Sequence, residues 1–268
     1  MNFLEKLFGK KSKEKVSVEK NTKKERAKPK VAPERIGELG EYKINIQLDQ
    51  FPPNYKHLND LMLENMKTHS GFSQIDHVLL TPYGIFVIET KNYAGEIKGG
   101  AQDKQWKVNK KFNMMNPFHQ NYGHMEAIKS CLNSDNPYSF VSMISFTQRA
   151  VFSISPELRK MTSDELCVYD TELTEFIKRK IQVIKLQSTA PIYKEDEIES
   201  IYKSLTNANV TDPAIREGHK QALLSASAKE DKCSICNKPV SRKVKKFCMS
   251  NKKFQGKIYC FDHQKNIS

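Results

Sequence analysis

The feature that most constrains this fold is a pair of apolar runs separated by a short turn sequence. Residues 72–80 and 85–90 are rich in β-branched and aromatic side chains, and residues 81–84 read Thr-Pro-Tyr-Gly. Proline at the second turn position and glycine at the fourth predict a β-hairpin closed by a type I turn in a four-residue loop. Leu80 then lies opposite Ile85, and the numbers of facing residues sum to 165. The sequence therefore predicts the hairpin and its register.

In this register two acidic residues face each other across the strands. Asp76 lies opposite Glu89, and facing side chains have Cβ atoms roughly 5 Å apart. Like charges so close destabilise a sheet unless something neutralises them, and a bound divalent cation would do so. The alternation of a strand also places Lys91 on the face of Glu89, with Phe86 and Ile88 on the other face. Two carboxylates and one lysine are thus expected to converge.

Such a group suits the hydrolysis of phosphodiester bonds. Carboxylate oxygens are the ligands that Mg²⁺ or Mn²⁺ prefers, and Mg²⁺ usually combines one or two carboxylates with water and substrate phosphate. The metal would polarise the scissile phosphate, and Lys91 would orient the attacking water or balance the developing charge. The alternative is a surface salt bridge between Glu89 and Lys91 without a catalytic role.

The order of the expected elements indicates an α/β fold. Helices are expected at 34–48, 118–132 and 172–184, and further strands at 141–146, 150–154 and 166–169; residues 195–228 are expected to form a polar helical connector. The predicted division is a basic, disordered tail over 1–30, a catalytic domain over 31–190, a connector over 191–228 and a metal module over 229–268.

Several motifs in this order resemble the nuclease-related domain (NERD) family. They are Gly37–Glu41, Gln74–His77, Gly84–Asn92, and Asn116-Pro117 followed by Gln120 and His124. The family is assigned to the PD-(D/E)XK nuclease superfamily. The resemblance covers about residues 35–155 and implies a restriction-endonuclease-like αβββαβ core.

The resemblance also implies roles for single residues. Glu41 matches the acidic residue of the first helix, Asp76 and Glu89 match the metal-binding carboxylates, Lys91 matches the catalytic lysine, and Gln120 matches a glutamine on the next helix. All five are expected to be catalytic, and the three acids to hold Mg²⁺ or Mn²⁺.

Other polar residues of these motifs leave alternatives open. His124 stands where related nucleases have tyrosine, so its role is undefined, and Glu38, one helical turn from Glu41, could replace it as a ligand. His77 follows Asp76 on the opposite strand face, which favours a core or supporting role. His119 and the single tryptophan, Trp106, are interpreted as packing or loop residues.

Four of the six cysteines lie in the last thirty-six residues. Cys233 and Cys236 form one pair and Cys260 and His263 form another, at the spacing of a structural zinc site in a zinc-ribbon-like module. Cys248 is a fifth candidate, and the alternative is that it packs beside the site. Cys131 and Cys167 stand apart and are expected to be buried, reduced thiols.

The net charge of +13 is unevenly distributed. Residues 1–30 hold eleven Lys and Arg against four acids, residues 229–268 hold eleven against three, and the middle holds twenty-two against twenty-four. Basic ends suit contact with a nucleic acid, expected to be DNA, although for the tail alone solubility is an equal explanation. No signal peptide or transmembrane segment is expected, which favours the cytoplasm, and residues 1–11 could touch an anionic membrane surface weakly.

Two functions are consistent with these features. The first is a metal-dependent nuclease in which the zinc module and the basic tail help to bind substrate. The second is a nuclease-fold protein that binds nucleic acid or acts as a scaffold without cleaving. Intact acidic and lysine positions favour the first, although a fold alone does not determine function.

Overall fold

The computed structural model describes residues 33–132, 138–188, 190–227, 231–236, 238, 240–265 and 267. The tail expected at residues 1–30, including the membrane contact expected of residues 1–11, lies outside these described residues.

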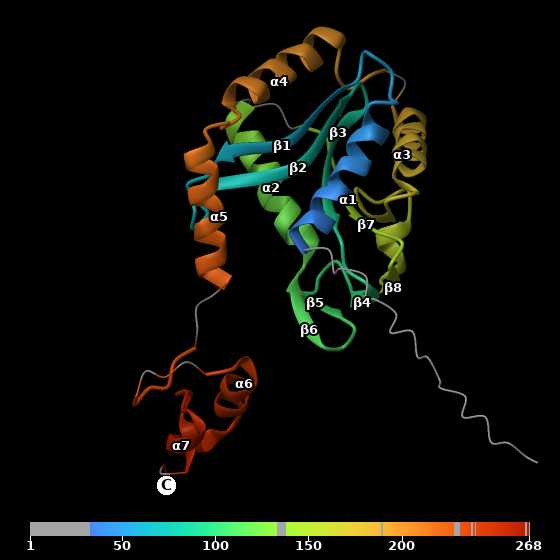
Figure 1. Ribbon diagram of the computed structural model, residues 1–268. Helices are drawn as coiled ribbons and strands as arrows, with labels where there is room; N and C mark the ends of the chain where they lie inside the picture. Colours follow the sequence, from blue (N-terminus) through green and yellow to red (C-terminus); the bar gives the residue numbers. More distant parts are fainter. Residues whose placement is uncertain are drawn as a thin grey trace, which may run out of the picture. The chain divides into compact units, whose positions relative to one another are not determined.

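A five-stranded mixed sheet forms the centre of the fold (Figure 1). Its strand order is β1-β2-β3-β7-β9, with bounds β1 Lys56–Glu64, β2 Phe72–Thr81, β3 Gly84–Lys91, β7 Phe140–Phe146 and β9 Glu165–Tyr169. Strands β1, β2 and β3 are antiparallel neighbours, whereas β7 runs parallel to both β3 and β9. His77 pairs with Ile88 and Leu80 with Ile85, so the predicted hairpin register is confirmed.

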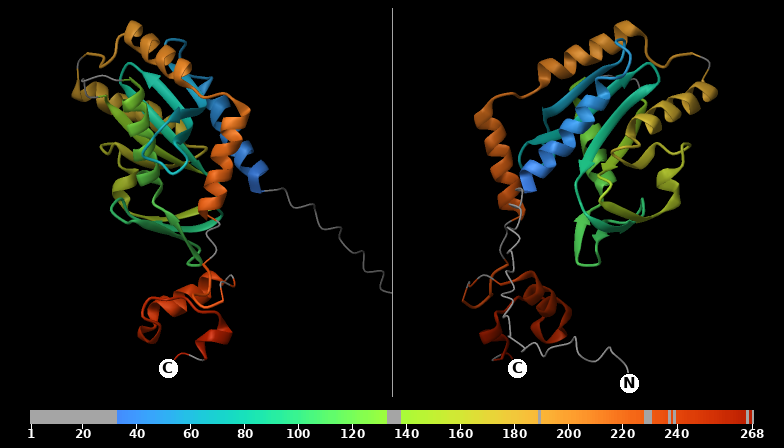
Figure 2. Two further views of the ribbon diagram at one scale, coloured as in Figure 1. Left: turned by 90° about the vertical axis from the view of Figure 1, so that its left-hand side faces the viewer. Right: turned by 45° about the vertical axis from the view of Figure 1, so that its right-hand side comes forward.

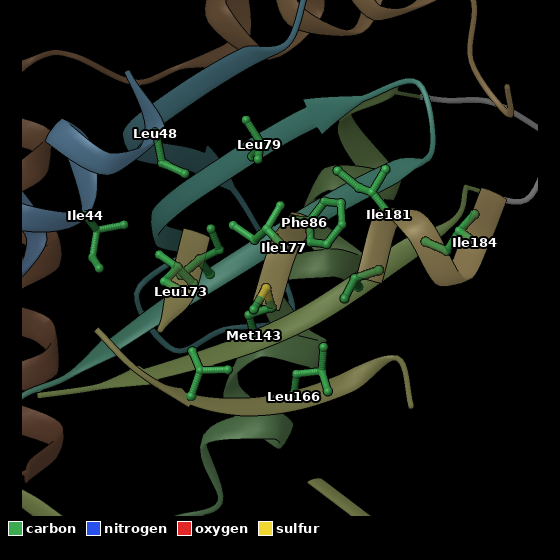
Figure 3. Packing of buried hydrophobic residues seen from close by; sticks show 13 residues of the cluster. Ile44, Leu48, Leu79, Phe86, Met143, Leu166, Leu173, Ile177, Ile181 and Ile184 are labelled. Carbon is green, nitrogen blue, oxygen red and sulfur yellow. The ribbon is translucent and has the colours of Figure 1, made fainter. Parts of the chain in front are cut away.

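Helices cover both faces of this sheet (Figure 2). Helices α1 (Pro33–Leu48) and α3 (Leu173–Gln187) pack on one face, and α2 (Pro117–Leu132) and α4 (Glu195–Ala208) pack on the other. Ile44, Phe86 and Ile177 belong to the first core, shown in Figure 3. Val87, Ile128 and Ile201 belong to the second. The order α1-β1-β2-β3-α2-β7 is the αβββαβ arrangement that the motifs implied.

A second, four-stranded sheet is inserted between β3 and α2 and completed by β8. Its order is β6-β5-β4-β8, with bounds β4 Gly95–Gly99, β5 Gln105–Val108, β6 Phe112–Met115 and β8 Ala150–Ile154. Trp106 is fully buried on its inner face and stacks on Phe146. A Cβ atom at Gly99 would lie 2.3 Å from the indole ring, so this position requires glycine.

Strand β1 and the three short strands β4, β5 and β6 were not predicted. In β1 the apolar residues are irregularly spaced, and Asp60 adopts a positive φ of 51° that interrupts the alternation of side chains. Helix α4, expected within a polar connector, contributes Ile198, Ile201 and Leu205 to the second core. Short elements and tertiary packing therefore account for what the sequence patterns missed.

The remaining elements are shorter or lie toward the C-terminus. They are the 3-10 helix η1 (Pro156–Arg159), helix α5 (Pro213–Ser227), and, in the C-terminal module, α6 (Arg242–Ser250), η2 (Lys252–Phe254) and α7 (Phe261–Gln264). Helix α5 is joined to the β1–β2 pair, because Arg216 bonds to Asp60 at 2.7 Å and His219 lies 2.9 Å from the Ser70 hydroxyl.

Candidate active site and zinc centre

Asp76 lies on β2 just beyond the last residue that pairs with β3. Continuing the register from the His77–Ile88 pair places it across from Glu89. One of its carboxylate oxygens, Oδ2, accepts a hydrogen bond of 2.7 Å from the backbone N–H of Thr90. The carboxylate is therefore held against the end of β3 by the backbone itself.

Glu89, Lys91 and Gln120 form a closed hydrogen-bonded group. The Lys91 ammonium lies 2.5 Å from Glu89 Oε1 and 2.9 Å from Gln120 Oε1, and Gln120 Nε2 donates to Glu89 Oε1 at 2.8 Å. Glu89 is 4% exposed, so the ion pair considered as an alternative is present but is buried rather than on the surface. Helix α2 thus supplies the amide that links the strand's acid to its lysine.

The second oxygen of Glu89 has no hydrogen-bond partner among the described residues. This atom, Oε2, is buried and lies 3.5 Å from His124 Nδ1, which is also buried and unpartnered. An unpartnered carboxylate oxygen in a buried site is costly, and a cation, a water or a proton would satisfy it. The donor set therefore fits a divalent metal that prefers oxygen ligands.

The electrostatics of the site reflect crowded negative charge. Burial raises the pKa of Asp76 well above its usual value, and the nearby Glu89 carboxylate raises it further. Burial also raises the pKa of Glu41, with Asp60 and Glu89 adding to the effect. Burial acts to lower the pKa of Lys91, but the Glu89 carboxylate outweighs this and the net pKa is raised. The site thus holds a charged lysine beside acids that resist ionisation together.

Part of this site lines a cavity of about 630 Å³. Glu41, Asp76 and Gln120 line it, as do three residues of α5, among them His219 and Leu223. Glu41 therefore approaches the site from α1, as expected. Glu38 is exposed and is not part of this lining, so the structure favours Glu41 over the alternative acid.

Glu41 and Asp76 line this cavity beside Glu89, but the three acids do not close around one point. In the described part of the chain, the only group of three or more acidic, histidine or cysteine residues whose ligand atoms converge to metal-binding distance is the C-terminal cluster. Mg²⁺ commonly takes one or two carboxylates and completes its shell with water and phosphate. Carboxylates that supply only part of a coordination shell are therefore compatible with Mg²⁺.

His77 and Trp106 are buried, whereas His119 lines the cavity. His77 lies on the opposite strand face, 99% buried, with its Nδ1 2.8 Å from Asn59 Oδ1, as a supporting residue would. Burial lowers its pKa to about 4. Trp106 is a core residue. His119, interpreted as a packing or loop residue, is exposed and lines the active-site cavity.

Several cavity residues were not foreseen from the sequence. His69, Phe72 and Met115 line the cavity, as does His219 of α5. His219 reaches Ser70 across a sequence separation of 149 residues, which no local pattern could reveal. His124 is buried on α2 beside Glu89, and burial lowers its pKa.

The C-terminal module brings four metal-ligand side chains together. The ligand atoms of Cys233, Cys236, Cys260 and His263 all lie within 4.8 Å of one another. Cys236 Sγ and Cys260 Sγ are 3.8 Å apart, and Cys260 Sγ and His263 Nδ1 are 3.2 Å apart. Tetrahedral zinc with Zn–S bonds near 2.3 Å requires sulfur atoms separated by about 3.8 Å. The predicted set of four residues therefore fits a zinc ion.

Within this cluster, burial acts to raise the pKa of Cys233, but backbone N–H groups, first that of Cys260, lower it to about 6, which favours the thiolate that zinc binds.

The fifth candidate, Cys248, lies outside the cluster. Cys248 is fully buried, packs with Val244 and Phe254, and accepts a hydrogen bond from the Tyr259 N–H at 3.4 Å. It thus packs beside the site instead of joining it.

The two remaining thiols were expected to be buried, and this is confirmed for Cys167 but only in part for Cys131. Cys167 is fully buried and Cys131 is half-buried. Burial raises the pKa of both thiols. Neither belongs to the metal-ligand cluster found among the described residues.

Comparison with known proteins finds similarity over much of the chain. An uncharacterized protein of Bacillus anthracis is 28% identical over 207 residues, which cover 75% of this chain and 90% of that protein. No solved structure matches the chain at a significant level. No helix in the described part of the chain is long and apolar enough to cross a membrane. Residues 36–147 match the family model described as nuclease-related domain, NERD, and that stretch contains all five candidate catalytic residues.

Proposed function

We propose that this protein is a Mg²⁺- or Mn²⁺-dependent nuclease that hydrolyses phosphodiester bonds of nucleic acid, with DNA as the expected substrate. The observation that carries the proposal is the group of Asp76, Glu89, Lys91 and Gln120, within a stretch that matches a nuclease-related domain; Asp76 and Gln120 of this group line one cavity. Fold similarity alone would be insufficient, because function depends on the site.

Asp76 and Glu89 would hold the metal, with Glu41 as the third acid. Two observations support this assignment. A bound cation would give the buried, unpartnered Oε2 of Glu89 a partner, and its positive charge would lower the raised pKa of Asp76. When bound, the metal would supply Lewis-acid polarisation of the scissile phosphate and of the attacking water. The chain's own residues would position the substrate and balance its charge.

Lys91 is suited to contact the reacting phosphate. An ammonium has three N–H donors, and Glu89 and Gln120 accept two of them. The third donor remains for a phosphate oxygen or for the attacking water. Because Glu89 keeps the pKa of Lys91 raised, the side chain is cationic at neutral pH and can stabilise negative charge that develops on the phosphate.

The zinc module and the basic ends would supply affinity. The four-residue cluster would hold a structural Zn²⁺, and zinc would contribute much of the folding free energy of so small a module. Its lysines, with exposed Phe247, suit contact with a polyanion that salt weakens.

A non-cleaving nucleic-acid-binding protein is the second candidate. The closed Glu89–Lys91–Gln120 group favours it, because these three side chains already satisfy one another. Binding of a metal and a phosphate must share or displace those bonds. The retained Asp76 and the unpartnered oxygen of Glu89 favour the nuclease.

The deciding experiment measures cleavage by the full-length protein. Labelled single- and double-stranded DNA and RNA are incubated with Mg²⁺, Mn²⁺ or EDTA, using Glu89→Gln as the site variant and Glu175→Gln, an exposed acid of α3, as the matched control. We expect metal-dependent cleavage that Glu89→Gln lowers by roughly a hundredfold or more and that the control retains. Full cleavage in EDTA, or by Glu89→Gln, would refute the proposed site; binding without cleavage in any metal would support the second candidate.

A further inference from the structure

The outer face of the four-stranded sheet concentrates positive charge that the chain's overall distribution conceals. Five lysines and two acids lie between residues 96 and 111, within a central region that is nearly neutral. Lys98 of β4 lies directly opposite Lys107 of β5, and both are exposed. In the part of the chain that the structure describes, neither lysine forms an ion pair with a carboxylate.

The inner face of the sheet determines this arrangement. Ile97 and Trp106, the neighbours of the two lysines along the strands, are fully buried. Because side chains alternate along a strand, their burial forces Lys98 and Lys107 outward. The Cβ atoms of two facing residues are roughly 5 Å apart, and facing like charges destabilise a sheet. The fold thus keeps an unfavourable pair in a position where a polyanion would neutralise it.

Polar donors extend the pair into a row across all four strands. Ser153 of β8 lies opposite Lys98, and Asn113 of β6 lies opposite Lys107. All four residues are exposed. Lysine, serine and asparagine side chains are common donors to phosphate oxygens of nucleic acids. The row therefore suits a sugar-phosphate backbone better than an apolar partner.

The same face continues into the candidate active site. Gln105 and Met115 form the next facing pair, and the Asn113 amide donates to Gln105 Oε1 at 3.0 Å. Met115 is 56% exposed and lines the cavity that also contains Asp76 and Gln120. Figure 1 shows β4, β5 and β6 beyond the end of β3 that carries the site.

We propose that this face, the row of Ser153, Lys98, Lys107 and Asn113, is a platform for the nucleic-acid backbone leading to the cavity. The proposal rests on the proposed function for its ligand class. It differs in placing sequence-independent contacts within the central domain, and not only in the basic ends. Charge complementarity and continuity with the cavity select a nucleic acid over an acidic protein.

The test compares paired charge removals in the full-length protein. Lys98→Gln/Lys107→Gln removes the platform charges, and Lys98→Arg/Lys107→Arg keeps them. The matched control is Lys178→Gln/Lys203→Gln, which removes the same charge from exposed positions on α3 and α4. Affinity for single- and double-stranded DNA oligonucleotides is measured in EDTA between about 50 and 200 mM salt. EDTA prevents metal-dependent cleavage during the measurement.

We expect the platform glutamine variant to bind roughly tenfold or more weakly near 0.1 M salt, with a salt slope for duplex DNA lower by about 1.8, because each lost phosphate contact removes about 0.9. The arginine variant and the control should bind nearly as the parent does. The glutamine variant should unfold at the same or a higher temperature, since it loses a repulsion.

Unchanged affinity and slope in the glutamine variant would overturn the platform and would point to an acidic protein as the partner of these lysines. An equal loss in the control would also overturn it, because general charge would then explain binding. Failure of the proposed function is distinguishable, since it appears as absent cleavage by the parent protein in Mg²⁺ or Mn²⁺ while the binding differences in EDTA persist.

Discussion

Replacing Asp76 with asparagine should make the metal-free protein more stable at neutral pH. The carboxylate is buried and faces Glu89 across the hairpin, and these two conditions raise its pKa. The amide oxygen of asparagine can still accept the hydrogen bond from Thr90 N–H, so the variant loses charge but little geometry. Relieving one repulsion between facing like charges is worth up to about 1 kcal/mol, or roughly 2–4 °C in a domain of this size.

The pH dependence has a defined sign. A carboxyl whose pKa is higher in the folded protein than in the unfolded chain costs no stability below the unfolded value of 3.8. The cost grows as the pH rises through the folded pKa. The advantage of Asp76→Asn should therefore be present at pH 7.5 and disappear near pH 3.5. Glu64→Gln, an exposed acid on β1, is the matched control and should show no such advantage.

Metal should reverse the order of stability. A divalent ion at one hundred times its Kd would stabilise the parent by about 2.7 kcal/mol, whereas the variant, lacking a ligand, would gain much less. The assay is thermal unfolding in EDTA and then in Mg²⁺ or Mn²⁺. A variant that is less stable than the parent in EDTA at pH 7.5, or that gains as much from metal, would refute the assignment of Asp76 as an uncompensated metal ligand.

Three further predictions concern single residues. Lys91→Gln should fold normally but lose metal-dependent cleavage by roughly a hundredfold or more, because in the proposed mechanism it removes a charge that would contact the phosphate; a cleavage assay showing full activity would contradict the mechanism. Because the pKa of His77 falls from 6.5 to about 4 on folding, its contribution to stability should be complete above pH 6.5 and fall by about 3 kcal/mol as the pH drops to 4. Urea denaturation of His77→Gln should show a correspondingly flatter pH profile, and an unchanged profile would assign the titration elsewhere. The parent should contain one equivalent of zinc by elemental analysis and Cys260→Ser should contain much less; less than half an equivalent in the parent would remove the zinc assignment.

The hairpin was predictable because two local signals agree. The turn residues Pro82 and Gly84 determine where the chain reverses, and the apolar alternation determines which side chains are buried. The same two signals place Asp76 opposite Glu89, as the observed register does. By contrast, the roles of Gln120 and Glu41 came from resemblance to a family, since nothing local brings α2 or α1 to this strand end.

The elements that escaped prediction share a dependence on tertiary contacts. Strands β5 and β6 have four residues each, too few for an alternating pattern to be distinguished from a loop. Their structure depends on Trp106, whose indole N–H donates to Gly100 O at 2.9 Å, and on Asn116, whose side chain donates to Ala101 O and Asp103 O. Such contacts join residues 6 to 15 positions apart and leave no periodic pattern in the sequence.

The near-zero net charge of the central region conceals an uneven distribution of charge within it. Over the whole central region the positive and negative charges nearly cancel, so the sequence predicted affinity for nucleic acid only at the two ends. The fold separates the two signs: the acids Glu41 and Asp76 line the cavity, whereas Lys98 and Lys107 lie on the outer face of the small sheet. A negatively charged cavity needs a positive surface beside it if a polyanion is to approach. Separation of charge within a neutral domain can therefore serve a nuclease as well as a net charge does.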